Sequence, residues 1–394
     1  MSQAPPALAF GALSLSYFAC LGLFNPYAPL WYQSLGFGTL AIGSIASLQA
    51  WTRVATPYAW SWFGDHGGRR VVLLRVAAAG SLLCAVALWG TRSFAAVATV
   101  TTLLFIFNSG VIPLSEAALS RHLATADGMD AGRYGRVRMW GSIGFIVVVL
   151  LGGTLLERGG IAVFPYAVAL LYAALMAAAL WLPAHRDEAH HGQAAPAVWP
   201  RLREPEVAWF FASVFFTVLA HTSAYTFLSL YLDALGYAKS TVGLMWAVSV
   251  LFEIGFFWSQ GHWFSRLSAH GWLMLAAVVS ALRFAATAAA AQWMVVLVVA
   301  QAAHAVTFAA HHGACTTTLH RLFPGRLRGR GQALYSALGY GISGVIGGVG
   351  GGWLIERHGY RAVFWAGAAA ALAGLASAWQ MGRVRPAPDV AVRS

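Results

Sequence analysis

The chain has few charged residues. Of its 394 residues, 10% are charged and 59% are apolar, whereas soluble domains carry about 25% charged residues. Acidic residues are the scarcer kind, with 13 Asp and Glu against 25 Lys and Arg, and Lys239 is the single lysine. This composition excludes an ordinary soluble domain and predicts a polytopic membrane protein. The arginines form no continuous patch, so the net charge of +12 indicates membrane topology and not a nucleic-acid partner.

Cysteines and enzyme motifs are also scarce. Cys20, Cys84 and Cys315 lie inside apolar runs without paired or metal-ligand spacing, so we expect buried packing residues and no metal site. The chain contains no H-E-x-x-H, G-x-S-x-G or G-x-x-x-x-G-K-[ST] motif. No lysine or arginine precedes the first apolar run, so we expect no cleaved signal peptide. These features argue against an enzyme and against ATP-driven transport.

Long apolar runs separated by short polar or Gly/Pro breaks predict an all-α membrane protein with about twelve spans. We place the spans at 9–32, 41–62, 71–90, 95–119, 135–156, 161–182, 207–231, 241–263, 271–289, 292–318, 331–355 and 361–381. The one long polar interval, 183–206, predicts a cytoplasmic linker. It separates an N-terminal six-helix bundle (1–182) from a C-terminal six-helix bundle with a short cytoplasmic tail (207–394).

Basic residues are distributed unequally between alternate loops. If the N-terminus is inside, eighteen arginines fall in the inner segments and only five basic residues fall in the outer loops. Because positive charge marks the cytoplasmic side, both termini and the linker are expected in the cytoplasm, with the protein in a bacterial inner membrane. Arg53 and Arg283 are left inside the predicted spans.

The two halves of the chain repeat one another. The segment LWYQSLGFGTLAIG (30–43) returns as LYLDALGYAKSTVG (230–243), and the same offset aligns Arg53 with Glu253. Both residues lie about twelve positions into apolar runs, which at 1.5 Å per residue is roughly 18 Å deep, near the bilayer midplane. Duplicated halves with ionisable groups at the midplane are typical of secondary transporters.

The end of span 2 carries a recognisable motif. The run W-F-G-D-H-G-G-R-R (62–70) resembles the loop signature G-x-x-x-D-[RK]-x-G-R-[RK] of the major facilitator superfamily, shortened at its start. The resemblance implies two pseudo-symmetric six-helix bundles and a gating loop formed by Asp65, Arg69 and Arg70. The acid would face a helix N-terminus and the arginines the anionic leaflet. The alternative is a tight, positively charged turn.

A second resemblance covers nearly the whole chain. The runs P-L-S-E-A (113–117) and G-R-V-R-M-W-G-S-I-G-F (135–145) are similar to the lactose permease and phenylpropionate permease branch. The runs H-A-V-T-F-A-A-H-H (304–312) and F-P-G-R-L-R-G-R-G-Q-A-L-Y-S (323–336) are especially similar to the phenylpropionate permeases. The branch implies proton-coupled uptake of a small molecule, with the proton as coupling ion and no other cofactor. We expect a monomer surrounded by membrane lipid.

The same resemblance assigns site residues. It implies that Glu116 and Arg138 bind substrate, because they match the acid and the arginine that do so in lactose permeases; the alternative is a fixed ion pair between spans 4 and 5. Phe145 replaces the tryptophan that stacks on sugar, so a sugar substrate is less expected. Thr307, three residues after His304, replaces a proton-bearing glutamate. The coupling proton must therefore reside elsewhere.

Glu253 is the remaining candidate for the proton site. Burial disfavours the charged form of a carboxyl group, so such a residue can load and release a proton. Arg283 could act as its counter-ion during the cycle; the alternative is a permanent bridge between the two residues. His304 could relay a proton or bind substrate, and the alternative is a neutral structural histidine.

Arg53 is the candidate anchor of the substrate. Gln49 lies one helical turn before it on the same face. Phe252, Phe256 and Phe257 are close to Glu253 in the sequence of the other half, and we expect them to supply aromatic neighbours around it. A guanidinium in an aromatic cavity suits an amphipathic carboxylate; Arg53 could instead pair with Glu253. One helical stripe of span 10, which is expected to line the cavity, consists of Gln301, His304, Phe308 and His311.

The sequence thus predicts a proton symporter for a phenylpropionate-like acid. The alternatives are a proton-coupled sugar or nucleoside symporter and an exporter of drugs or metabolites. Exporters of this superfamily usually carry a G-P pair in span 5. Span 5 here contains GSIGFIVVVLLGG without proline, which favours uptake.

Overall fold

The computed structural model describes residues 6–125, 128–183 and 198–384. We call the first two segments the N-terminal half and the third the C-terminal half. The N-terminal half contains α1 (Pro6–Ser34), α2 (Thr39–Gly67), α3 (Arg70–Ala87), α4 (Phe94–Asn108), α5 (Val111–His122), β1 (Ala124–Thr125), β2 (Gly128–Met129), α6 (Ala131–Gly159), η1 (Ile161–Val163) and α7 (Phe164–Trp181).

The C-terminal half begins with the four-residue helix α8 (Trp199–Leu202). It continues with α9 (Pro205–Ala234), α10 (Lys239–Ser259), η2 (Gln260–His262), η3 (Phe264–Arg266), α11 (Ala269–Ala290), α12 (Met294–Ala302), η4 (Ala305–Ala310), α13 (His311–Leu322), η5 (Gly325–Leu327), α14 (Arg328–Leu334), η6 (Tyr335–Ile342), α15 (Ser343–His358) and α16 (Tyr360–Arg383). The elements η4 and η6 are π-helical, and the other η elements are 3-10 turns.

Eleven helices or continuous helical segments of the described residues are long and apolar enough to cross a membrane. The helix that is missing from this set is α2, which has 29 residues but whose polar side chains, Gln49 and Arg53 among them, lower its hydropathy. With α2 included, the arrangement confirms the expected all-α membrane fold. The proposed boundaries of the two bundles and of the linker stay a prediction, and residues 184–197 of that linker lie outside the described part.

The fourth predicted span is divided in two. Helix α4 ends at Asn108 and α5 starts at Val111, because Pro113 has no N–H to continue the α-helical pattern. The carbonyl of Ile106 at this break accepts hydrogen bonds from Trp60 Nε1 at 2.9 Å and from Ser109 Oγ at 2.8 Å. The indole of α2 therefore stabilises the break at membrane depth, where an unpaired carbonyl is costly.

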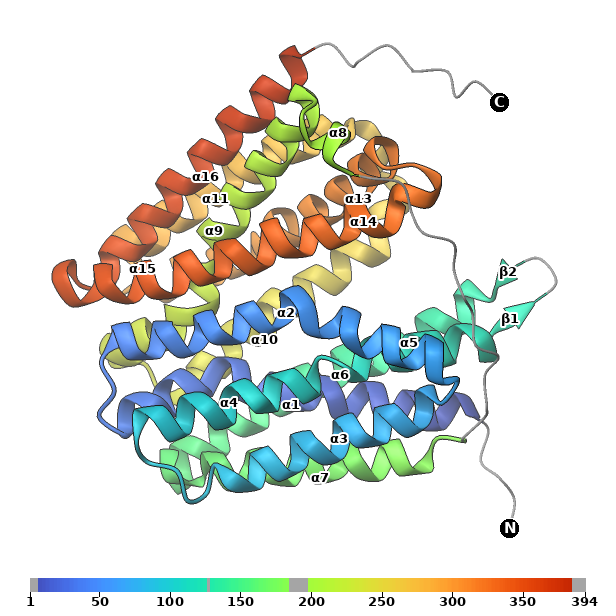
Figure 1. Ribbon diagram of the computed structural model, residues 1–394. Coiled ribbons are helices and arrows are strands. Elements are labelled where there is room, and N and C mark those ends of the chain that lie inside the picture. Colours follow the sequence, from blue (N-terminus) through green and yellow to red (C-terminus); the bar gives the residue numbers. More distant parts are fainter. Residues whose placement is uncertain (1–5, 126–127, 184–197, 385–394) are drawn as a thin grey trace.

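Equivalent helices pack in the same way in the two halves. Helix α1 lies along α6 and α7, and α9 lies along α16 and α15. The halves meet along two long contacts, α2 with α15 and α6 with α10. Figure 1 shows the two groups of helices converging on the side away from the start of α1 and the end of α16, and diverging toward the side where those two helix ends lie.

Close helix approach explains the first of these contacts. Gly43 of α2 and Gly348 of α15 face each other so closely that a Cβ on either would meet the other's backbone. Ser47 Oγ donates to the Val345 carbonyl at 2.8 Å and accepts from Val349 N at 3.1 Å. A single apolar core contains buried residues of both halves, whereas a second, smaller core belongs to the C-terminal half alone.

Candidate functional site

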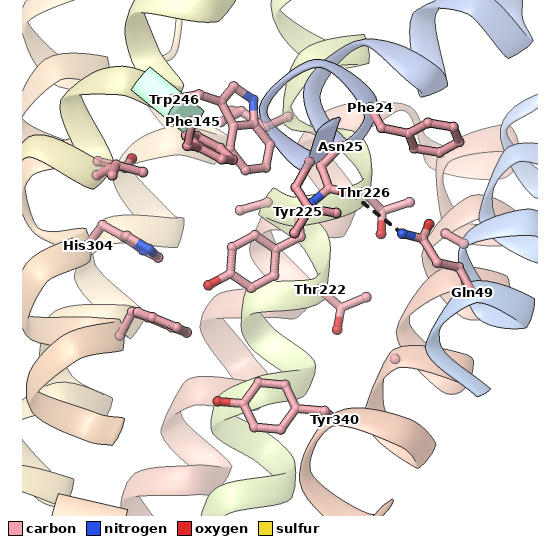
Figure 2. A pocket seen from close by; sticks show the side chains of 18 of the residues that line it. Phe24, Asn25, Gln49, Phe145, Thr222, Tyr225, Thr226, Trp246, His304 and Tyr340 are labelled. Carbon is pink, nitrogen blue, oxygen red and sulfur yellow. Dashed lines mark hydrogen bonds between the residues drawn. The ribbon is translucent and has the colours of Figure 1, made fainter. Parts of the chain in front are cut away.

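A cavity of about 620 Å³ lies between the two halves. Side chains of α1, α2 and α6 from the N-terminal half line it, together with side chains of α9 to α12, η4, α13, η6 and α15 from the C-terminal half. Figure 2 shows Gln49 on one wall and His304 on the opposite wall, with Tyr225 between them in this view. A cavity of this size accommodates a small organic molecule.

The charged residues that line the cavity are three arginines and one glutamate. Arg53 comes from α2, Arg138 from α6, Arg283 from α11 and Glu253 from α10. The side chains of Arg53 and Arg138 are exposed to the cavity, and Arg138 lies over the Phe18 ring with its Cζ atom 4.2 Å from the centroid. Among the described residues, neither arginine forms an ion pair with a carboxylate. The site therefore carries an excess of positive charge.

Arg283 is held by neutral acceptors. Its side chain is buried, and Nη2 donates to Gln301 Oε1 at 3.1 Å while Nη1 donates to Thr307 Oγ1 at 3.0 Å. Ser249 Oγ donates to the same Gln301 oxygen at 2.8 Å. Thr307, whose hydroxyl cannot titrate, thus serves as a hydrogen-bond acceptor for the guanidinium.

His304 lies between Arg283 and Glu253. Arg283 Nη1 is 3.0 Å from His304 Nδ1 and can only donate, so Nδ1 accepts and the ring carries its proton on Nε2. That Nε2 atom is 3.8 Å from Glu253 Oε2. The alternative of a permanent bridge between Glu253 and Arg283 is wrong for this structure, because the imidazole stands between the two charges.

The π-helical element η4 changes which histidine faces the cavity. The rings of His304, Phe308 and His312 form a stack, with centroid distances of 5.1 Å and 6.3 Å, and all three line the cavity. A π-helical turn is wider than an α-helical one and moves the residues that follow it around the helix axis. The expected position of His311 is therefore wrong, since His311 is buried beside Cys315 Sγ.

Aromatic side chains form much of the apolar wall. Phe145, which replaces the sugar-stacking tryptophan of lactose permeases, lines the cavity, and so do Phe257, Tyr225 and Trp246. The rings of Tyr225 and Trp246 lie 6.3 Å apart. Sequence reasoning missed this tryptophan because it lies on α10, far along the chain from Phe145, and no local pattern distinguishes it from lipid-facing aromatics.

Polar side chains of α1 and α2 form another part of the wall. Gln49 Nε2 is 3.5 Å from Asn25 Oδ1, and both amides line the cavity (Figure 2). Glu116 lies elsewhere. It lines a separate small cavity of about 30 Å³ that also contains Arg138, and its Oε1 accepts a hydrogen bond from Tyr134 Oη at 3.3 Å. The structure thus separates Glu116 from the large cavity, although Arg138 borders both.

The predicted gating loop is partly described. Helix α2 ends at Gly67, Gly68 adopts a left-handed conformation, and α3 begins at Arg70 with Arg69 as its N-cap residue. The side chain of Asp65 lies outside the described residues, so its assignment stays a prediction, as do those of Arg69 and Arg70. In the described part of the chain, no group of three or more His, Cys, Asp or Glu side chains could hold a metal ion.

Comparison with known proteins relates this architecture to a family. The MFS_1 like family matches residues 11–366. The chain belongs to this family of the major facilitator superfamily. It is therefore a multi-pass membrane transporter and not an enzyme.

Two relatives are similar over most of their lengths. A probable 3-phenylpropionic acid transporter from Escherichia coli is 30% identical over 366 residues, covering 91% of this chain and 93% of the relative. Maltose permease from Geobacillus stearothermophilus is 28% identical over 366 residues, covering 89% and 88%. The family resemblance expected from the sequence is confirmed, whereas the two relatives are named for different kinds of substrate.

Solved structures show the same fold. The nucleoside transporter NupG superimposes with a TM-score of 0.81 over 97% of this chain and 100% of that one, at 17% identity. A bacterial homologue of the lysosomal transporter Spinster, in an occupied state, superimposes with a TM-score of 0.76 at 13% identity and covers 97% and 98% of the two chains. These likenesses establish the fold alone.

Proposed function

We propose that this transporter takes up a small amphipathic carboxylate, such as a phenylpropionate-like acid, in symport with protons. The observation that carries the proposal is the charge of the cavity, which has three arginines and one glutamate on its walls. A substrate carboxylate would offset the excess positive charge, and a guanidinium can bind it through two parallel hydrogen bonds. The relative described as a probable 3-phenylpropionic acid transporter supports the same substrate class.

Arg53 is the proposed anchor for the carboxylate. Arg283 is buried and already donates to Gln301, His304 and Thr307, whereas Arg53 has an exposed side chain and no described ion-pair partner. Arg138 and Gln49 can assist from neighbouring helices. The ring of the substrate would lie against the aromatic wall. Apolar contact there favours binding, and the ring has no polar group that needs a hydrogen-bond partner.

Glu253 is the proposed proton site. Its side chain is 23% exposed, so it can exchange a proton with water in the cavity while remaining largely shielded. When Glu253 is charged, it repels a substrate carboxylate and offsets one arginine. When it is protonated, the cavity contains only positive formal charges, and anion binding is favoured. Proton loading and substrate loading are thereby coupled, with His304 and Arg283 orienting the carboxyl group.

The proposal includes the membrane arrangement and the coupling ion. Both termini face the cytoplasm of a bacterial inner membrane, and the linker at 183–206 joins two six-helix bundles on that side. The transporter acts as a monomer, the coupling ion is a proton, and no cofactor takes part. The cavity alternately opens to the two sides as the bundles rock about it.

The experiment that tests the proposal is uptake into proteoliposomes. Radiolabelled 3-phenylpropionate is offered with an imposed pH gradient, acidic outside, and unlabelled maltose or uridine is added as competitor. We expect accumulation that collapses when a protonophore dissipates the gradient and that neither competitor reduces. Accumulation of radiolabelled maltose or uridine in parallel arms, with none of the acid, would contradict the proposal.

A sugar or nucleoside is the second candidate substrate. Trp246 supplies an indole surface that the sequence analysis did not find, and the Asn25 and Gln49 amides supply neutral hydrogen-bonding groups. These are groups that bind hydroxyls and bases. Maltose permease and NupG have such substrates by description. The arms of the same uptake experiment that use radiolabelled maltose or uridine distinguish this alternative.

A further inference from the structure

Two glutamates connect the halves at the end of the molecule that lies away from the start of α1 and the end of α16. Near the end of α6, Glu157 Oε2 accepts a hydrogen bond from Ser240 N at 3.1 Å, at the start of α10. Near the end of α15, Glu356 Oε1 accepts a hydrogen bond from Leu40 N at 3.0 Å, at the start of α2. Each contact therefore joins a carboxylate of one half to a helix N-terminus of the other.

The two contacts are equivalent in the repeat. The glutamates occur in the runs L-L-E-R-G-G (155–160) and L-I-E-R-H-G (354–359). Their donors, Leu40 and Ser240, are each the second residue of their helix and are separated by the same 200 residues that relate the two halves. The pair thus reflects the internal symmetry of the fold, and neither contact is an isolated feature of one loop.

Neither helix receives a cap from its own chain segment. The residue before α2 is Gly38 and the residue before α10 is Ala238, and neither has a side-chain cap hydrogen bond. The first N–H groups of a helix have no partner within the helix and need an acceptor. Gly38 also leaves room for the carboxylate, because a Cβ there would lie 2.8 Å from Glu356 Oε1. The opposite half supplies what each helix lacks.

We propose that Glu157 and Glu356 form a paired latch that holds this end of the cavity closed. When the halves separate here, both helix N-termini must lose their carboxylates together. Both glutamate side chains are exposed to solvent, so water can replace each bond at small cost, which suits a contact that forms and breaks in every cycle. Buried neighbours such as Tyr27, whose hydroxyl is 3.3 Å from the Lys239 carbonyl, complete the closed interface.

The latch can be tested by measuring the separation of the two halves. Ser34 and Ala234 are exposed, equivalent positions at this end, one in each half. Spin labels are placed at Ser34→Cys and Ala234→Cys after replacement of Cys20, Cys84 and Cys315, and their distance distribution is recorded by double electron–electron resonance. We expect Glu157→Gln and Glu356→Gln each to increase the fraction of long distances. In the double variant the open-to-closed ratio, relative to wild type, should equal the product of the two single effects.

The matched control is Glu206→Gln, which changes a carboxylate at the opposite end of the C-terminal half, where Glu206 pairs with Arg321. This control should leave the distribution unchanged. If the double glutamine variant has a lowered melting temperature, a double Glu157→Asp and Glu356→Asp variant is measured in its place. This variant keeps both charges but has shorter side chains, which cannot reach the helix N-termini. An unaltered distribution in a folded double variant would overturn the latch, and so would an equal shift in the Glu206→Gln control. Because the readout needs no substrate, failure of the latch is distinguishable from failure of the proposed function.

Discussion

Arg283 donates a hydrogen bond through Nη1 to His304 Nδ1 at 3.0 Å. The bond fixes the imidazole as the tautomer that is protonated on Nε2, and it aims that proton toward the carboxyl group of Glu253. The arginine therefore acts on the acid through a neutral ring. This order of groups distinguishes the site from a simple ion pair.

Replacing Arg283 by Met should destabilise the protein strongly. The change leaves His304 Nδ1 buried without a donor and removes one hydrogen bond each from Gln301 Oε1 and Thr307 Oγ1, and an unsatisfied buried group costs about 1–3 kcal/mol. The measurement is the melting temperature of the purified variant in detergent, with Arg92→Met in an exposed loop as control. Equal melting temperatures for the two variants would contradict the assigned network.

Glu253→Gln should abolish uphill accumulation while sparing exchange of substrate for substrate. The amide is similar in size to the acid but carries no titratable proton, and counterflow requires no net proton release. Accumulation under a pH gradient and counterflow without one are measured in the same proteoliposomes. The control is Glu204→Gln, which removes a charge outside the cavity. Normal accumulation by Glu253→Gln would transfer the proton role to His304 or Glu116.

Arg53→Lys should weaken carboxylate binding. The lysine keeps the positive charge but loses the planar fork, so up to about 1.5–3 kcal/mol of charge-assisted hydrogen bonding is at stake. That range corresponds to a Kd raised by at most about 10- to 150-fold. Binding is measured calorimetrically with 3-phenylpropionate, and Arg92→Lys serves as the matched control. If both variants bind like the wild type, Arg53 is not the anchor.

The proposed orientation of the protein in the membrane predicts which loops a reagent added outside the cell can label. A membrane-impermeant maleimide added to intact cells should label Arg92→Cys in the loop between α3 and α4, but not Arg203→Cys beside α8. Arg92 is expected outside and Arg203 inside, because basic residues accumulate in the cytoplasmic segments. Labelling of Arg203→Cys in intact cells would reverse the proposed topology. Each cysteine is introduced after the three native cysteines have been replaced.

Much of the fold could be predicted because the bilayer imposes its length and polarity on the sequence. Apolar runs indicated the membrane helices, and the 200-residue repeat brought Arg53 and Glu253 to one cavity. Helix α2 shows where hydropathy alone is insufficient, since its cavity-facing polar residues lower its apolar character. Gln49 and Arg53 lower the hydropathy of α2, and the same two side chains line the cavity.

The rest of the site depended on features with no simple sequence pattern. The stripe of span 10 assumed an α-helix of constant pitch, and the π-helical element η4 placed His312, not His311, in the cavity. Trp246 lies on α10 in the C-terminal half, whereas Phe145 lies on α6 in the N-terminal half. The sequence around Phe145 therefore could not predict that this tryptophan lines the cavity. Glu116 matches the family motif but lines a separate small cavity, because it comes from α5, a helix that does not line the large cavity.

The most direct test of the central claim compares a carboxylic acid with its own amide. The cavity has the charge to bind an anion, so its affinity should depend on the negative charge of the ligand more than on the ring. The Kd values of 3-phenylpropionate and 3-phenylpropionamide for the wild-type protein are measured by isothermal titration calorimetry. We predict that the acid binds at least about tenfold more tightly, which corresponds to the lower end of the range for a charge-assisted hydrogen bond. Equal affinity for acid and amide, or tighter binding of maltose than of either, would contradict the account.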